Sequence, residues 1–212
     1  MPAAAAAPLA ADELRLCWCP EQAGPLPRRA RVDQLLRHTL APLVGLPVEA
    51  LRFGREPRGR PFLDHDRAPD FNLSDTLGGT LIAVSRAARV GVDLERLDRR
   101  PPVARLAARW FSREECLQLQ ALDPEPARSA FLRLWTAKEA SCKATGTGIF
   151  GYLAAWRFDA LAEQPLLAAA PADAGAPHRW RFARLSPSLE HTAVLAMRDA
   201  PTLSISCFRL LA

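Results

Sequence analysis

Hydrophobic residues recur along this chain with two different periods, which separate the expected strands from the expected helices. In Glu13–Cys19 they alternate, so that Leu14, Leu16 and Trp18 share one face of a predicted strand. In Arg28–Val44 they recur every three or four residues and form one apolar stripe, as on an amphipathic helix. Arginines occupy the other face of this helix, which is either a solvated basic surface or a grip for an anion.

The segment Phe71–Arg96 has the clearest β pattern. It contains three short β-rich runs separated by turn-forming residues: Phe71–Ser74, Thr80–Ser85 and Val90–Glu95. We predict that they form an antiparallel meander, because short strands joined by tight turns pair in this way. In the last strand Asp93 and Glu95 lie on one face, opposite Val92 and Leu94.

After Pro101-Pro102 the pattern becomes helical and later returns to strands. Helices are expected at Val103–Trp110, at Ser112–Leu122 and from Pro124 to Gly146. Strands are expected at Trp180–Leu185, Thr192–Met197 and Leu203–Phe208. The fold class is therefore α+β, with helices and strands in both halves of the chain. We place the boundary between an N-terminal half, 1–90, and a C-terminal half, 91–212.

The helix that ends near Gly146 carries the most unusual residues. Trp135, Glu139 and Lys143 form one row on it, because residues four apart are neighbours on a helix. The chain has 28 lysine and arginine residues, yet its only two lysines are Lys138 and Lys143. Arginine does not replace lysine where a compact charge must bind one oxygen, so both lysines are candidates for chemistry. The alternative is an ordinary surface ion pair between Glu139 and Lys143.

Composition excludes several classes of protein. With 212 residues, 49% of them hydrophobic, the chain can bury a sizeable core, and no run approaches the roughly 18 apolar residues of a membrane span. Five cysteines without a CxxC pair argue against a zinc site and favour free thiols in a reducing cytoplasm. The net charge of +5 favours anionic partners without specifying which.

The acid pair on the last strand of the β region suggests a cation. Two carboxylates one pleat apart, such as Asp93 and Glu95, resist joint ionisation unless a cation lies between them. Mg²⁺ suits such hard oxygen ligands and binds a few carboxylates together with phosphate oxygens and water. The alternative is that both acids lie on the solvent-exposed face of an edge strand.

Five segments occur in the order and spacing of a known family. They are RGRPFL (58–63), FNLSDT (71–76), GVDLE (91–95), FSREE (111–115) and WTAKEASCK (135–143). Over about residues 55–150 the chain resembles the 4′-phosphopantetheinyl transferases, specifically the long, single-chain Sfp type. The resemblance implies two similar halves that form a pseudo-dimer. Each half would be a small, mainly antiparallel sheet packed with helices, with the active site in the cleft between them.

The reaction that the resemblance implies moves 4′-phosphopantetheine from coenzyme A to a serine of an apo acyl or peptidyl carrier protein and releases 3′,5′-ADP. Asp93, Glu95 and Glu139 would surround Mg²⁺, because they match the D-x-E and K-E positions of the family. Glu139 would also be the general base, directly or through a bound water molecule. Lys143 would hold the α-phosphate and protonate or shield the leaving group, and Lys138 would add a second phosphate contact.

The same match suggests how the nucleotide is held. Arg60 is expected near the 3′-phosphate of coenzyme A, and Ser74 matches a residue at the pyrophosphate end. One or two of the first helix arginines would share the 3′-phosphate: Arg28, Arg29 and Arg31. Asp75 departs from the family, which usually has histidine there, and its charge would repel a phosphate. We expect Asp75 to turn toward a backbone amide or the adenine, or to be shielded by an arginine.

Two other functions fit parts of the pattern. A metal-dependent nuclease or phosphodiesterase would also use D-x-E with a distant acid and lysine, although its E-x-K pair usually lies on a strand. A non-catalytic module that binds carrier proteins would not need intact carboxylates. For the transferase, coenzyme A and an acidic apo carrier protein are the expected partners, with no nucleic acid and no membrane. We expect a cytoplasmic monomer, because an internally duplicated chain completes its own site.

Overall fold

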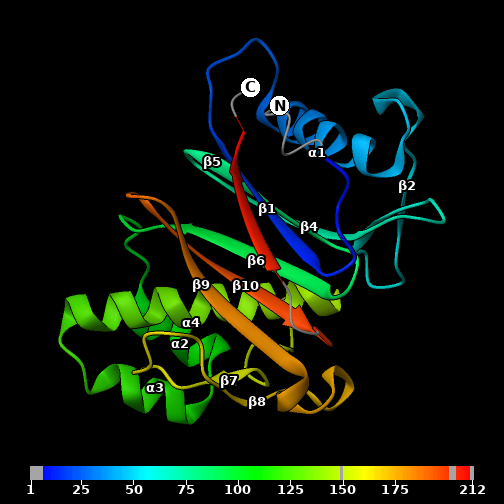
Figure 1. The fold of residues 1–212 in the computed structure, drawn as a ribbon. Coiled ribbons are helices and arrows are strands. Elements are labelled where there is room, and N and C mark those ends of the chain that lie inside the picture. Colours follow the sequence, from blue (N-terminus) through cyan, green and yellow to red (C-terminus); the bar gives the residue numbers. More distant parts are fainter. Residues whose placement is uncertain (1–6, 149, 201–203, 211–212) are drawn as a thin grey trace.

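A computed structural model of the chain describes residues 7–148, 150–200 and 204–210, and its architecture is α+β (Figure 1). The strands are β1 (Glu13–Pro20), β2 (Phe53–Arg55), β3 (Pro61–Leu63), β4 (Asp70–Thr76), β5 (Gly79–Ser85), β6 (Arg89–Arg96), β7 (Arg157–Phe158), β8 (Leu167–Ala169), β9 (Trp180–Ser188), β10 (His191–Arg198) and β11 (Ser204–Arg209). The α-helices are α1 (Arg28–Val44), α2 (Val103–Trp110), α3 (Arg113–Gln120) and α4 (Pro124–Thr145). Short 3-10 helices are η2 (Val48–Ala50), η3 (Ala172–Ala174) and η4 (Pro177–Arg179).

Two small sheets form the centre of the molecule. One has the strand order β11-β1-β5-β4 and the other β6-β10-β9, and β2-β3 and β7-β8 are two-stranded hairpins. In Figure 1, α1 covers the outer side of the first sheet, while α4, with α2 and α3 below it in this view, covers the outer side of the second. Buried leucine, valine and alanine side chains from β1, β5, β6 and β10 fill the space between the sheets. The two sheets are therefore the inner layers and the helices the outer ones.

Local predictions of helices and their ends agree well with the structure. The helix predicted at Arg28–Val44 is α1, and α3 begins at a capping box in which Ser112 and Glu115 exchange hydrogen bonds. Gly146 ends α4 in the left-handed conformation, with a φ of 73° that favours glycine. These ends depend on residues within one turn, which is why sequence alone predicts them.

The predicted meander is wrong in its third strand. β4 and β5 pair as expected, but β6 pairs with β10, more than ninety residues later, in antiparallel register. The buried face of β6, with Val92 and Leu94, packs between the two sheets, so the strand belongs to the second sheet and faces the first. Pairing between strands so distant in sequence leaves no local signal.

Side chains of β4 join the two sheets in place of a backbone ladder. Asp70, Asn72 and Ser74 alternate along β4, and each accepts a hydrogen bond from a backbone N–H of β6. The donors are Val90 at 2.7 Å, Val92 at 2.9 Å and Leu94 at 3.1 Å. An edge strand with open N–H groups would otherwise be a site for unwanted pairing. These contacts fix the register of β4 against β6.

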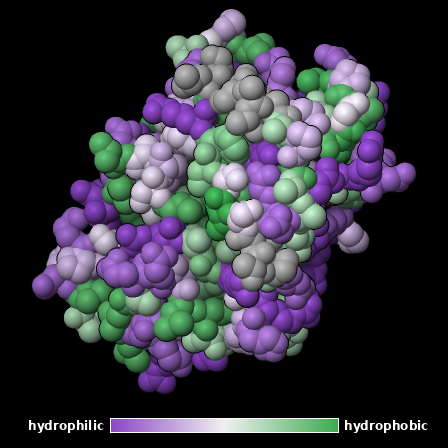
Figure 2. Space-filling model, viewed as in Figure 1, coloured by the Kyte–Doolittle hydropathy of each residue, from purple (hydrophilic) through white to green (hydrophobic). Residues whose placement is uncertain are grey.

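The C-terminal part of the chain returns to the first sheet. β11 pairs in parallel with β1, while the predicted start of this strand, Leu203, lies outside the described residues. The expected boundary between residues 90 and 91 falls inside β6. Within the described part of the chain, no helix has the length and apolar character needed to cross a bilayer. The face in Figure 2 carries small apolar patches separated by polar ones.

Candidate active site

Gly91 allows α4 to lie directly on β6. A Cβ atom at this position would be 2.1 Å from the carbonyl oxygen of Ala140 and 2.5 Å from the backbone nitrogen of Ala144. Alternate residues of a strand share a face, so the helix that covers Gly91 also covers Asp93 and Glu95. The close approach thus brings the acid pair of β6 to the polar row of α4.

Asp93, Lys143 and Ser74 form a hydrogen-bonded group at this junction. Lys143 Nζ donates to Asp93 Oδ1 at 2.7 Å and to Ser74 Oγ at 2.8 Å, and Ser74 Oγ donates to the same Asp93 oxygen at 3.0 Å. Asp93 is 3% exposed, whereas the side chain of Lys143 is 29% exposed. The ammonium group thus connects the buried acid to solvent. The structure brings these three predicted residues together.

Glu95 lies beside the same group and is held by a cation. It forms an ion pair with Arg99, whose guanidinium lies over the ring of Trp135 at 5.4 Å from the centroid. Burial, followed by the negative charge of Asp93, raises the pKa of Glu95 to about 7, against the opposing charges of Arg99 and Lys143. The raised value shows that the cations present do not fully compensate this carboxylate.

Glu139, which lies on α4, is affected by the same charges. Burial, followed by the charge of Asp93, raises the pKa of Glu139 to about 7, while Lys143 opposes the shift and Glu95 adds to it. Each of these effects requires proximity, so the three carboxylates form one electrostatic cluster. The structure brings Asp93 into contact with Lys143 and places Glu95 and Glu139 near enough to share its charge.

The donor atoms of this cluster suit a hard divalent cation. Asp93 Oδ2 is buried and has no hydrogen-bond partner, and two neighbouring carboxylates have raised pKa values. Surplus carboxylate charge of this kind is what Mg²⁺ compensates. Across residues 7–148, 150–200 and 204–210, no three Asp, Glu, His or Cys side chains are already grouped as a metal site. The carboxylates therefore fit Mg²⁺ by their chemistry, and Lys143 bonds to Asp93 Oδ1 while Arg99 bonds to Glu95 Oε1.

The predicted phosphate contact of Lys138 must be corrected. Its side chain is completely buried, and Nζ bonds to Glu115 Oε2 at 2.8 Å, to the carbonyl of Leu153 at 2.8 Å and to the carbonyl of Trp156. An ammonium has three donors, so all are used inside the protein. Burial lowers the pKa of Lys138, and the charge of Glu115 opposes this shift. Lys138 binds the interior and not a ligand.

Arg60 must be corrected for the same reason. It is 4% exposed, and both of its terminal nitrogens bind the Asp70 carboxylate, at 2.7 and 2.8 Å. Its remaining donors bind the backbone carbonyls of Phe71, Val90 and Lys143. Arg60 therefore ties β4, β6 and the end of α4 together, its second Nη1 N–H faces Glu56 at 3.9 Å, and its side chain, 2% exposed, is too buried to meet a 3′-phosphate.

The helix arginines lie around a small cavity on the α1 side of the first sheet. Arg28 Nε pairs with Asp75 Oδ2 at 2.8 Å, and Arg31 pairs with Glu21 at 3.2 Å. Asp75 also accepts a hydrogen bond from Thr80 at 2.8 Å. An arginine thus shields Asp75, which is one of the arrangements expected from the sequence. The cavity has a volume of about 90 Å³ and includes all five of these side chains.

Sequence reasoning missed two features of the site. Arg99 was not singled out, although its position four residues after Glu95 could have suggested a pair. Asp70 and Asn72 were also missed, although their alternation with Ser74 on one strand was a readable signal. The partners of these residues lie on β6, so the sequence could indicate their shared face but not its contact.

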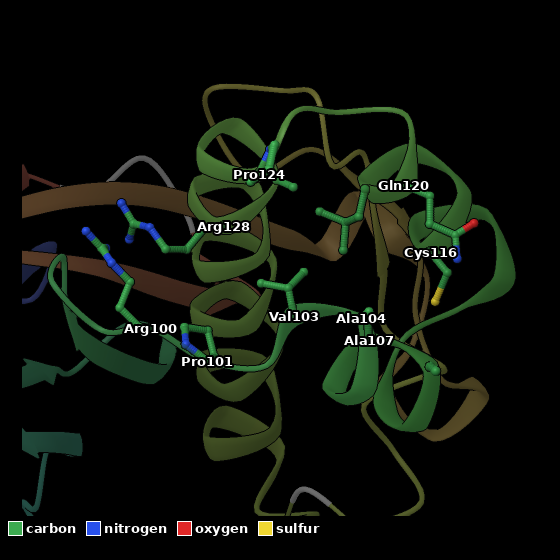
Figure 3. A pocket seen from close by; sticks show the side chains of 12 residues that line it. Arg100, Pro101, Val103, Ala104, Ala107, Cys116, Gln120, Pro124 and Arg128 are labelled. Carbon is green, nitrogen blue, oxygen red and sulfur yellow. The ribbon is translucent and has the colours of Figure 1, made fainter.

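A larger apolar cavity lies between α2, α3 and the first turns of α4. Its volume is about 390 Å³, and Val103, Ala107 and Leu119 are among the side chains that line it. Figure 3 places Arg100 and Arg128 at one end of this cavity and Cys116 and Gln120 at the other. It does not include the carboxylate cluster, although Arg100 follows Arg99 directly in the chain.

Comparison with known proteins shows which family this chain is similar to. A profile of the 4′-phosphopantetheinyl transferase superfamily matches residues 89–197, half of the chain. The chain is 37% identical over 118 residues to the 4′-phosphopantetheinyl transferase HetI of Nostoc, covering 54% of this chain and 50% of that protein. It is 34% identical over 117 residues to psf-1 of Bacillus pumilus (55% and 49% covered) and 28% identical over 117 residues to Sfp of Bacillus subtilis (55% and 51% covered). The chain spans about half the length of these curated relatives.

Proposed function

Because the chain belongs to the 4′-phosphopantetheinyl transferase superfamily, we propose that it transfers 4′-phosphopantetheine from coenzyme A to a serine of an apo acyl or peptidyl carrier protein and releases 3′,5′-ADP. The observation that carries this proposal is the cluster of Asp93, Glu95, Glu139 and Lys143 at the junction of β6 and α4. All four residues lie in the segment that matches the family.

The two halves act as a pseudo-dimer, with the reaction at their junction. In support, each of the two sheets is covered by one long helix, α1 or α4, with β11 of the C-terminal half added to the first sheet. Ser74 on β4 bonds to Asp93 on β6 and to Lys143 on α4, so residues of both halves meet at one point. A chain that supplies both halves has no need of a second copy, and we propose that it works as a monomer in the cytoplasm.

The residues of the cluster have separate roles in the reaction. The serine oxygen attacks the β-phosphorus, and negative charge grows on the oxygen that leaves with the α-phosphate. Among the described residues Lys143 Nζ bonds only to Ser74 and Asp93, so its third N–H is available to donate to this oxygen. Glu139 accepts the serine proton, directly or through a bound water molecule.

Asp93, Glu95 and Glu139 would hold Mg²⁺. When bound, this ion supplies positive charge beside the diphosphate of coenzyme A. The unpartnered oxygen of Asp93 supports this assignment, as do the raised pKa values of both glutamates.

The nucleotide end of coenzyme A binds beside α1. Arg28 and Arg31 line the cavity there, together with Asp75. Ser74 directly precedes Asp75, the β4 residue that faces the cavity, and it contacts Lys143 at the diphosphate end. Coenzyme A would pass over the end of β4 from one face of the sheet to the other, since adjacent strand residues face opposite sides.

The carrier protein docks at the apolar cavity between α2, α3 and α4. Val103 and Ala107 offer an apolar surface, and Arg100 and Arg128 provide positive charge at one end (Figure 3). An acidic carrier helix with apolar side chains complements such a surface. Arg100 also follows the arginine that pairs with Glu95, so the docked serine would arrive beside the cluster.

A mass measurement tests this function. The protein is mixed with coenzyme A, Mg²⁺ and an apo acyl carrier protein, and the molecular mass of the carrier is measured by mass spectrometry. We expect its mass to rise by one phosphopantetheine. No gain with several acyl and peptidyl carriers, together with cleavage of a DNA substrate, would favour the nuclease instead.

A further inference from the structure

The last turn of α4 is held by two arginines that lie outside the helix. The final four carbonyls of an α-helix have no partner within it. In α4 the carbonyl of Lys143 accepts a hydrogen bond from Arg60 Nε at 3.0 Å, and the carbonyl of Ala144 accepts one from Arg89 Nε at 2.5 Å. Positive charge at this end also interacts favourably with the helix dipole. The backbone of Lys143 is therefore fixed by groups from other parts of the fold.

Glu56, in the turn between β2 and β3, joins these two arginines. Its carboxylate accepts hydrogen bonds from both terminal nitrogens of Arg89, at 2.9 and 2.6 Å, and lies 3.9 Å from Arg60 Nη1. The hydrogen bonding from Arg89 lowers the pKa of Glu56, so the carboxylate is ionised at neutral pH. Within the turn, the N–H of Glu56 donates to the carbonyl of Arg60 at 2.9 Å. Glu56 thus holds both guanidinium groups at the end of the helix.

The same turn lies directly against the end of α4. A Cβ atom at Gly146, the residue that ends the helix, would be 3.0 Å from Arg60 Cβ and 3.5 Å from Glu56 Oε2. Packing this close leaves the last turn of the helix little room to shift toward the hairpin. Arg60 extends the contact inward, because one of its terminal nitrogens also binds backbone carbonyls of β4 and β6.

These contacts set the spacing of the three elements that meet at the candidate active site. β4 carries Ser74, β6 carries Asp93 and α4 carries Lys143. The Nζ of this lysine bonds to Ser74 Oγ at 2.8 Å and to Asp93 Oδ1 at 2.7 Å. Its carbonyl is bound by Arg60, so both ends of the residue are held. A displacement of about 1 Å in a reacting group can cost on the order of 100-fold in rate, so the position of the helix end affects the chemistry.

We propose that Glu56 is a positioning residue for the transfer, which acts through Arg60 and Arg89 on the last turn of α4 and keeps Lys143 Nζ beside the oxygen that leaves with the nucleotide. The inference rests on the proposed function, because it concerns the geometry of the same reaction. Glu56 does not line the cavity beside α1, and we assign it no contact with coenzyme A. Its loss should therefore lower kcat and leave KM for coenzyme A unchanged.

The first test measures kcat and KM of Glu56→Ala with coenzyme A, Mg²⁺ and an apo acyl carrier protein. We expect kcat to fall about tenfold and KM for coenzyme A to stay within about twofold of the parent value. Asp173→Ala is the matched control, since Asp173 pairs with Arg58 of the same turn at 3.0 Å. Its two partners, Arg58 and Tyr152, lie outside α4, so kcat should be unchanged. A normal kcat in Glu56→Ala, or an equal fall in the control, would overturn the inference.

A double variant shows whether the effect passes through Lys143. In the Lys143→Ala background there is no ammonium group to displace, so adding Glu56→Ala should lower kcat by less than about twofold. An equal tenfold fall in both backgrounds would mean that the two residues act independently, and it would overturn the inference.

A measurement without substrate separates the positioning role from the proposed function. The chain has only two lysines, Lys138 and Lys143, so labelling the lysine Cε with carbon-13 gives one NMR carbon signal from each, and Lys143→Ala assigns them. In Glu56→Ala the Lys143 signal should move toward that of a solvent-exposed lysine, whereas the signal of the buried Lys138 should not move. A Lys143 signal that stays in place would overturn the inference. A shifted signal without transfer by the parent protein to any carrier would support the positioning and overturn only the proposed function.

Discussion

Replacing Lys138 with methionine should destabilise the fold strongly, because the ammonium group holds together three parts of the structure. Its Nζ joins α4 to Glu115 at the start of α3 and to the carbonyls of Leu153 and Trp156. Glu115 is 1% exposed and also accepts the backbone N–H groups of Ser112 and Phe158. Methionine fills a similar volume but leaves the carboxylate and two carbonyls without this donor.

The cost can be worked from these contacts. Removing one partner of a buried ion pair typically costs about 3–5 kcal/mol, a large part of the roughly 5–15 kcal/mol that stabilises a typical domain. For a protein of this length that corresponds to a fall in Tm of roughly 6–20 °C. Urea unfolding followed by circular dichroism measures the free energy difference directly.

A second variant isolates the buried charge as the cause. Glu115→Gln keeps the capping box of α3 through its amide oxygen but loses the hydrogen bond from Phe158 N–H, because the other end of the amide is a donor. The double variant Glu115→Gln/Lys138→Met removes both charges, so it should be about 2 kcal/mol more stable than Lys138→Met alone. The reasoning would be refuted if Lys138→Met unfolded within 1 kcal/mol of the parent protein and showed a raised KM for coenzyme A. That result would return Lys138 to the phosphate contact expected from the sequence.

Three further predictions concern the cluster and its support. Glu139→Gln and Lys143→Ala should each reduce transfer at least 100-fold in Mg²⁺ buffer with the circular dichroism spectrum unchanged, and near-normal turnover would contradict their roles. Chelation with EDTA should abolish transfer, and added Mg²⁺ should restore it and raise Tm in the parent protein but not in Asp93→Asn. Gly91→Ala should cost more than about 3 kcal/mol or prevent folding, because its Cβ would meet the backbone of α4, whereas Gly45→Ala, with nothing within 4 Å, should cost only about 1 kcal/mol; equal costs would contradict the close approach.

The parts of the fold that depend on neighbouring residues were predictable. The bounds of α1, the capping box of α3 and the left-handed glycine after α4 each follow from residues within one or two turns. The partner of β6 was not predictable, since β10 lies more than ninety residues away. The parallel pairing of β11 with β1 at the opposite end of the chain could not be predicted for the same reason.

The same distinction between neighbouring and distant residues applies to the candidate site. Asp93 and Glu95 share a strand face, and Glu139 and Lys143 share a helix face, so each pair follows from a local period. The contact between these two faces belongs to the tertiary structure, and it depends on Gly91, which allows α4 to pack closely on β6. Only the family resemblance predicted that the two faces meet, because the periods alone give no information about contacts between distant segments.

The prediction for Lys138 was wrong because it relied on the scarcity of lysine and not on the geometry of the helix. The scarcity of lysine suggested one shared role for Lys138 and Lys143, but residues five apart on a helix point about 140° away from each other. Two side chains so separated cannot both reach one small ligand, whereas Glu139 and Lys143, four apart, differ by only about 40°. The structure follows the geometry: Lys143 faces β6 and Lys138 faces α3. The two lysines therefore have separate roles: the ammonium of Lys143 lies in the candidate active site, and that of Lys138 neutralises a buried carboxylate.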